Sequence, residues 1–185
     1  FVTNGYWRDY TNMDFLTFGV EDYKKNHPGQ PLGYDLVKQM PQTKISNYIF
    51  KNKGNLQFED KRNDWGITEP LISNGAAYTD LDNDGDLDLV VNNIGSNASV
   101  YRNNSEKNKD NHFLRIQLQD TGYNKFAIGA KVSIENLTGS KQYAEMQPVR
   151  GFQSSVEPLI HFGLGKDTLV KEVVVRWPDG SSATI

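Results

Sequence analysis

Residues 78–93 read YTDLDNDGDLDLVVNN, and this stretch decides the fold prediction. Aspartates stand at every second position from residue 80 to residue 88, and Leu81, Leu87 and Leu89 alternate with them. Because a period of two is typical of strands with one buried face, the leucines anchor the acidic segment on a hydrophobic core. We therefore predict an acidic loop, Asp80–Asp88, that joins two β-strands.

The acidic loop has the ligand spacing of a calcium site. Counted from Asp80, carboxylates occupy positions 1, 3, 5 and 9, and Gly85 occupies position 6, where a calcium loop bends sharply. Two carboxylates about 4 Å apart repel by about 1 kcal/mol in water and about 4 kcal/mol at an effective dielectric constant of 20, so the cluster favours a bound cation over a solvated acidic turn. The predicted Ca²⁺ ligands are the side chains of Asp80, Asp82, Asp84 and Asp88 and the backbone carbonyl of Asp86.

The residues after the loop exclude an EF-hand. An EF-hand loop needs an acidic residue at position 12, and position 12 here is Val91, within an apolar strand pattern. The predicted site therefore lies between strands rather than between helices.

Strand patterns and turn residues also surround the loop. Residues 48–50 and 56–59 flank an Asn- and Gly-containing turn, which predicts a hairpin. Residues 99–104 (SVYRNN) echo residues 47–52 (NYIFKN) about 50 positions earlier, a spacing typical of β-propeller blades. Short helices are predicted at 13–26 and 32–40, which make a helical insertion over about 12–41.

The polar, aperiodic stretch Glu106–Asn111 predicts a domain boundary. Beyond it, Leu114, Ile116 and Leu118 alternate with polar residues, and residues 172–177 (EVVVRW) form the strongest strand pattern of this half. Such alternation indicates antiparallel strands with one solvated face, and hence a small β-sandwich. We predict a mainly β protein with a propeller-type blade region at 1–110 and an antiparallel sandwich at 111–185.

Composition narrows the function. The formal net charge is −3 and no basic stripe is present, so a nucleic-acid partner is disfavoured. The chain has no cysteine and therefore no disulfide or thiolate metal site. No apolar run approaches the roughly 20 residues of a membrane span. Both ends fall within strand patterns, so we expect a piece of a longer protein whose targeting signal lies upstream.

Two family resemblances rest on these motifs. Residues 78–93, with NYIFKNKGNLQFED before and VYRNN after them, resemble an FG-GAP/VCBS repeat, the calcium-binding blade unit of integrin-type β-propellers. The segments NHFLRIQL, AIGAKV, RGFQSS, HFGLG and RWPDG make residues 111–185 similar to the ASPIC/UnbV domain. This order of domains resembles the secreted cartilage acidic protein group and its bacterial surface relatives. The resemblance implies a calcium-binding, secreted or cell-surface protein.

No enzymatic motif stands out. The three histidines are scattered, and no pattern in the sequence pairs Glu145, Glu157 or Asp179 as general acid and base. We predict a non-enzymatic calcium-binding module for adhesion, with a protein or glycan ligand at the cell surface. The alternatives are a glycan-binding accessory module of a carbohydrate-processing system, to which aromatic residues such as Trp7 and Trp65 would contribute, an RNA-binding protein and a hydrolase.

Overall fold

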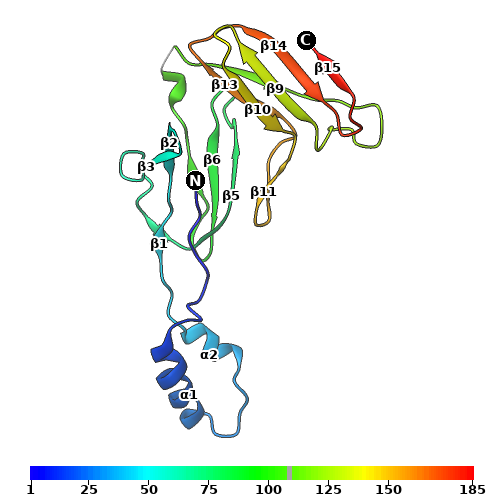
Figure 1. The fold of residues 1–185 in the computed structure, drawn as a ribbon. Helices are drawn as coiled ribbons and strands as arrows, with labels where there is room; N and C mark the ends of the chain where they lie inside the picture. Colours follow the sequence, from blue (N-terminus) through cyan, green and yellow to red (C-terminus); the bar gives the residue numbers. More distant parts are fainter. Residues whose placement is uncertain (108–109) are drawn as a thin grey trace. The chain divides into compact units, whose positions relative to one another are not determined.

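The computed structural model describes residues 1–107 and 110–185 and is mainly antiparallel β-structure (Figure 1). Contacts divide the chain into two compact units, one of residues 1–75 and 91–99 and the other of residues 76–90 and 100–185. The predicted boundary Glu106–Asn111 includes residues 108 and 109, which lie outside the described residues. The division into domains at 1–110 and 111–185 stays a prediction.

The first unit contains the two helical segments expected from the sequence. A π-helical turn, Phe15–Gly19, runs into α1, Val20–Asn26, and α2 covers Tyr34–Gln39. A Cβ at Gly19 would lie 2.8 Å from the Phe15 ring, so a larger residue there would require that ring to shift. The buried Tyr23 stacks on His27 with 4.3 Å between ring centroids, which packs the end of α1.

The strands that follow form small antiparallel sheets. The expected hairpin is present as β2 and β3, and residue 2 at the N-terminus forms an isolated antiparallel bridge with Tyr48. A three-stranded sheet has the order β5-β6-β7. The bounds are β1 Ile45–Ser46, β2 Phe50–Gly54, β3 Gln57–Asp60, β4 Pro70–Leu71, β5 Ser73–Thr79, β6 Asp88–Asn93 and β7 Ser99–Tyr101, and β1 pairs with β4.

A buried polar network joins the segments of the first unit. Asn47 donates from Nδ2 to Ser73 Oγ at 2.8 Å, and that hydroxyl donates to Asn93 Oδ1 at 2.7 Å. Asn47 Oδ1 accepts the backbone N–H of Asn4 at 3.0 Å. Asn47 and Ser73 are each 1% exposed, so these hydrogen bonds replace lost hydration and fix the pairing of distant segments.

The second unit has an apolar core between two antiparallel sheets. One sheet has the order β10-β9-β14-β15, and the other pairs β8 with β13. Val132 and Ile134 of β9, Val175 of β14, and Ile160 and Phe162 of β13 belong to one buried cluster. The bounds are β8 His112–Ile116, β9 Lys131–Asn136, β10 Lys141–Glu145, β11 Val149–Gly151, β12 Ser154–Ser155, β13 Ile160–Gly165, β14 Val170–Arg176 and β15 Ser182–Thr184.

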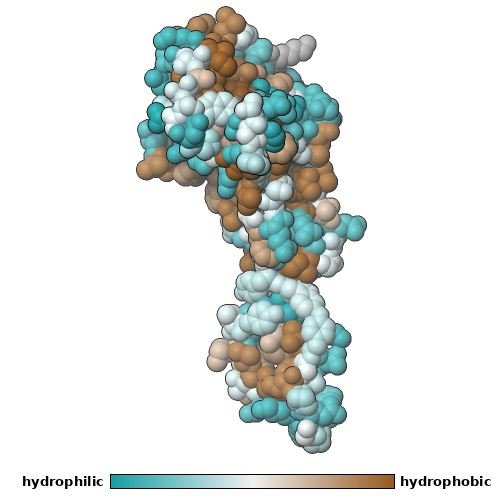
Figure 2. Space-filling model, turned by 90° about the vertical axis from the view of Figure 1, so that its right-hand side faces the viewer, coloured by the Kyte–Doolittle hydropathy of each residue, from teal (hydrophilic) through white to brown (hydrophobic). Residues whose placement is uncertain are grey.

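The alternation expected for the C-terminal strands is therefore present, and the sheets of the described residues stay open rather than closing into a barrel. Hydrophobic and hydrophilic residues are interspersed over the face shown in Figure 2. Among the described residues, no helix has the length and apolar character needed to cross a membrane.

Candidate metal centre

The acidic loop connects β5, which ends at Thr79, to β6, which begins at Asp88. Its bend depends on Gly85, which has a positive φ of 93° and lies against the ring of Phe113. A Cβ at residue 85 would lie 1.8 Å from a ring carbon, so only glycine fits. Phe113 in turn stacks on His161 with 5.5 Å between ring centroids, and this aromatic pair on β8 and β13 supports the loop.

Asp88 fixes the base of the loop. Asp88 is only 2% exposed. Oδ2 accepts the backbone N–H of Leu81 at 3.1 Å, and Oδ1 accepts the backbone N–H of Asn103 at 2.8 Å. Both carboxylate oxygens thus hold the loop and the chain after β7 in place.

Two groups of carboxylates within the second unit have the spacing of metal ligands. Asp80, Asp82 and Asp84 each offer an oxygen within 4.8 Å of the others, and so do Asp84, Asp86 and Glu106. Oxygens that share one Ca²⁺ each lie about 2.3–2.6 Å from it, so they can be up to about 5 Å apart. Both groups therefore fit a hard divalent cation, and Asp84 belongs to both.

Three oxygens in these groups are buried without a hydrogen-bond partner. They are Asp80 Oδ1, Asp86 Oδ1 and Glu106 Oε2. Asp80 and Asp86 are only 9% and 8% exposed. A buried acceptor left unsatisfied costs about 1–3 kcal/mol, and more when it is charged. A cation would remove that cost.

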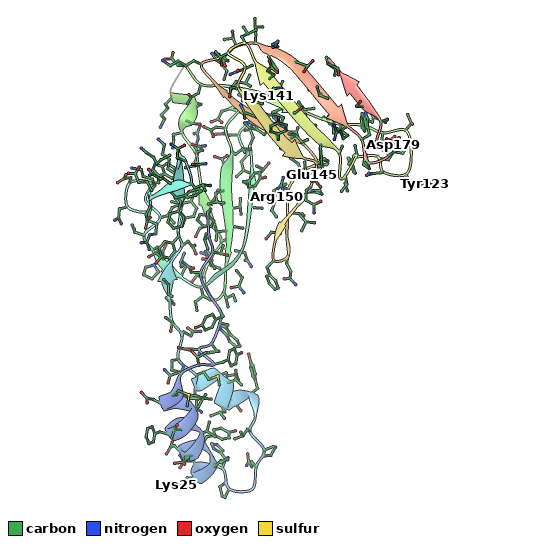
Figure 3. The ribbon with its side chains drawn as sticks, viewed as in Figure 1. Lys25, Tyr123, Lys141, Glu145, Arg150 and Asp179 are labelled. Carbon is green, nitrogen blue, oxygen red and sulfur yellow. The ribbon has the colours of Figure 1, made fainter. Side chains whose placement is uncertain are left out.

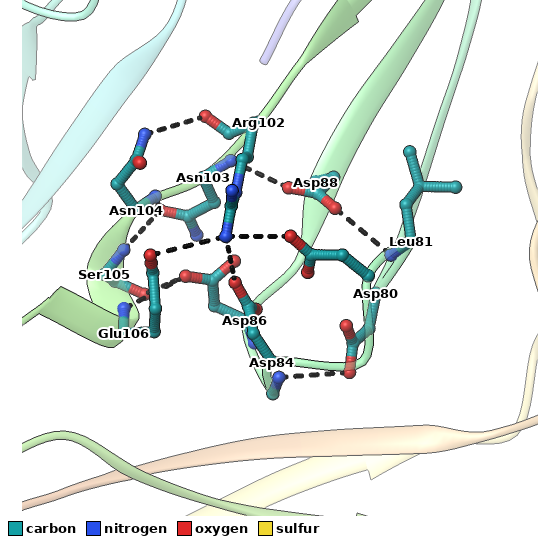
Figure 4. A network of polar contacts seen from close by, with 12 residues as sticks. Asp80, Leu81, Asp84, Asp86, Asp88, Arg102, Asn103, Asn104, Ser105 and Glu106 are labelled. Carbon is teal, nitrogen blue, oxygen red and sulfur yellow. Dashed lines mark hydrogen bonds and ion pairs between the residues drawn. The ribbon is translucent and has the colours of Figure 1, made fainter.

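Two arginines offset part of the negative charge, and Figure 4 shows one of them, Arg102, among the carboxylates. One guanidinium nitrogen of Arg102 lies 2.9 Å from Asp82, 3.1 Å from Asp84 and 3.5 Å from Glu106. Arg115 lies 3.4 Å from Asp80 Oδ2. With Asp86 and Asp88 included, six carboxylates of the described residues face two arginines of the same part of the chain, which leaves an excess of four negative charges among these groups.

The pKa values of Asp82 and Asp84 shift in opposite directions. Burial raises the pKa of Asp82, and the neighbouring Asp84 raises it further, while Arg102 opposes both effects. The backbone N–H of Asp86 lowers the pKa of Asp84, and Arg102 lowers it further. Asp84 is thus held ionised at the point where the two carboxylate groups meet.

The structure brings together most of the residues predicted from the sequence and adds one. Asp80, Asp82 and Asp84 form one group, whereas Asp88 belongs to neither group and Asp86 enters the second through its side chain. The roles of the Asp88 carboxylate and the Asp86 carbonyl as ligands stay predictions. Glu106 was missed because it lies in the polar stretch interpreted as a boundary.

The carboxylates considered for hydrolysis lie elsewhere. Glu145 and Glu157 line one cavity with Arg150 and His161, and Asp179 lines another. Glu145, Arg150 and Asp179 are labelled in Figure 3. The first cavity has a volume of about 200 Å³, below the roughly 300–1,000 Å³ of typical ligand sites. Glu157 is also 3.5 Å from Arg115. This cavity is therefore a weak candidate for catalysis.

Comparison with known proteins identifies the C-terminal part. Residues 120–185 match the family model described as ASPIC and UnbV. This confirms the predicted ASPIC/UnbV domain. It contains the four-stranded sheet and most of the core of the second unit.

The sequence is also similar to cartilage acidic protein 1. The Homo sapiens protein is 38% identical over 109 residues, which cover 57% of this chain and 16% of that protein. The Mus musculus protein is 37% identical over 109 residues, with the same coverage, and the Xenopus tropicalis protein is 35% identical over 113 residues, with coverage of 60% and 17%. The chain spans about one sixth of the length of these relatives.

The similarity reaches beyond the ASPIC/UnbV domain. A continuous match to 57% of the chain is longer than residues 120–185, so it extends toward the N-terminus. Because it covers more than half of the chain, it includes the middle of the sequence, and with it most of the acidic loop, wherever it begins. The FG-GAP/VCBS repeat itself stays a prediction.

Proposed function

We propose that this chain is a non-enzymatic, calcium-binding module that acts outside the cytoplasm in adhesion or ligand binding. The observation that carries the proposal is the convergence of buried, unpartnered carboxylate oxygens in the acidic loop. Oxygen donors without nitrogen or sulfur ligands suit Ca²⁺, which takes about six to eight oxygens and tolerates irregular geometry.

The loop supplies a first calcium ion with three carboxylates from Asp80, Asp82 and Asp84. The Asp86 carbonyl, the Asp88 carboxylate and water complete its coordination. The strands β5 and β6 on either side support an FG-GAP/VCBS assignment and a propeller-type blade, since this repeat places its calcium loop between strands.

Two further observations support an extracellular role. Calcium sites of extracellular modules typically have dissociation constants of about 10⁻⁴–10⁻³ M, which suits a loop with partly exposed ligands such as Asp82. The similar proteins in three vertebrates are named after cartilage and not after a reaction. We therefore place this chain outside the cell, with a protein or glycan ligand.

Isothermal titration with Ca²⁺ tests the metal site. The parent chain should bind calcium with a dissociation constant of about 10⁻⁴–10⁻³ M. Asp84→Asn should weaken binding at least about tenfold, because it removes a charge from both carboxylate groups. Asp14→Asn, a change of the same type on the exposed surface of the other unit, should leave binding unchanged. A parent chain that binds no calcium at millimolar concentration would refute the proposal.

The ligand class needs a separate test. Surface-immobilised protein should retain extracellular-matrix proteins or glycans in calcium and release them in chelator. Retention of glycans alone would favour the accessory-module alternative. Retention of RNA that persists at high salt would favour the nucleic-acid alternative, because nonspecific phosphate contacts are lost as salt rises.

A further inference from the structure

We propose that the acidic centre binds a second divalent cation, held by Asp84, Asp86 and Glu106 and sharing Asp84 with the first. The inference rests on the proposed calcium function, which concerns the group of Asp80, Asp82 and Asp84. Both groups lie within the second unit of the chain.

The second group has two unpartnered buried oxygens of its own. Asp86 is 92% buried, and its Oδ1 has no hydrogen-bond partner, while its Oδ2 accepts Ser105 Oγ and the backbone N–H of Glu106, both at 3.1 Å. Oδ2 therefore fixes the orientation of the Asp86 side chain, and Oδ1 is left available to a cation. Glu106 Oε2 is likewise buried without a partner.

The 3₁₀ turn Ser105–Lys107 presents Glu106 to the loop. The hydrogen bonds from this turn to Asp86 tie the two carboxylates to each other. The second group is thus positioned by backbone contacts and not only by flexible side chains.

An open cavity adjoins all three carboxylates of the second group, but only the shared Asp84 of the first group. Asp84, Asp86 and Glu106 all line a cavity of about 680 Å³, whereas Asp80 and Asp82 do not. Three carboxylates supply only part of the coordination shell of a divalent ion, so water must supply the rest. The cavity gives that water access to Asp84, Asp86 and Glu106.

The charge of the centre also favours two ions. Six carboxylates against Arg102 and Arg115 leave an excess of four negative charges, and Arg115 is shared with Glu157 as well. One divalent ion leaves at least two of these charges uncompensated. A second ion neutralises the remainder.

Calcium stoichiometry, measured by titration calorimetry and native mass spectrometry on the whole 185-residue chain, tests the proposal. The parent chain should bind two Ca²⁺ ions. Glu106→Gln should bind one ion with near-parental affinity and lose or weaken the other at least about tenfold, whereas Asp82→Asn should weaken only the first ion. Glu69→Gln, at an exposed position outside the second unit, should keep both ions.

The outcomes separate the two proposals. A parent chain that binds one ion, or a Glu106→Gln variant that still binds two with unchanged affinity, overturns the second site and leaves the first intact. A parent chain that binds none overturns both. The melting temperature of each variant in chelator should match that of the parent chain. If Glu106→Gln melts at a much lower temperature, Glu106→Ala replaces it in the comparison of stoichiometry.

Discussion

Arg102 is predicted to compete with calcium for the same oxygens. Its guanidinium nitrogen contacts Asp82, Asp84 and Glu106 at 2.9, 3.1 and 3.5 Å. A cation that ligates these carboxylates has to displace the arginine, so the free energy of the ion pairs is subtracted from that of metal binding. The change Arg102→Gln removes this competition and keeps a polar side chain of similar length.

The size of the effect follows from solvent exposure. The Arg102 side chain is 58% exposed, so solvent screens its three ion pairs and their combined effect is small. Arg102→Gln should therefore tighten calcium binding by roughly a few-fold, and by less than about tenfold.

Titration calorimetry at constant ionic strength measures this change. Arg102→Lys keeps the charge and should tighten binding less than Arg102→Gln does. Arg176→Gln removes a positive charge from β14 and should leave the affinity unchanged. If Arg102→Gln binds calcium with the parental affinity or more weakly, Arg102 does not compete with the ion and the reasoning fails.

Three further predictions concern stability. Gly85→Ala should lower the free energy of unfolding by about 2–4 kcal/mol in chemical denaturation, because the new Cβ overlaps Phe113 at a positive φ; an unchanged midpoint would contradict the packing. Asn47→Ala should lower it by about 1–3 kcal/mol, since the partners of Asn47 in its buried network, Ser73 among them, lose a hydrogen bond; a variant as stable as the parent would show that the network is dispensable. Burial lowers the pKa of His161 from its usual 6.5, and Arg115 lowers it further. The neutral ring therefore contributes to the stability of the folded chain above about pH 6.5, and this contribution is lost as the pH falls through the lowered pKa. The melting temperature should thus fall more for the parent than for His161→Phe between about pH 7.5 and pH 5.5, and equal losses would exclude this role.

The local part of the carboxylate cluster could be predicted from the sequence. Asp80, Asp82, Asp84 and Gly85 lie within one short loop, so their spacing alone brings the side chains together once the loop bends. The flanking strands were predictable from their period of two, but the buried face was not. Asp80, Asp86 and Asp88 are buried, whereas Leu81, which the alternation predicts to anchor the loop on a core, is 50% exposed.

The non-local part could not be predicted in this way. Glu106 and Arg102 reach the loop from the segment after β7, and Asn103 N donates to Asp88 from the same segment. Their approach depends on how β6 and β7 pair, which side-chain periodicity does not determine. A polar stretch such as Glu106–Asn111 has the composition of a linker whether or not one carboxylate in it faces a cation.

The aromatic contacts that support the acidic loop are also non-local in the sequence. Phe113 and His161 come from β8 and β13, which pair with Phe113 opposite Gly163. Each residue alone fits an ordinary strand pattern. Their contact with Gly85 becomes visible only when the strands and the loop are placed together.

Thermal melting with calcium and with chelator tests the central claim most directly. A ligand that binds only the folded chain adds about 2.7 kcal/mol at a concentration 100-fold above its dissociation constant, which corresponds to roughly 5–10 °C for a chain of this size. The parent chain should melt higher by about that amount in saturating calcium than in chelator, and Asp84→Ala should lose most of the increase. A parent chain whose melting temperature is the same in both conditions across the millimolar range would contradict the account, because the acidic loop would then be a solvated turn.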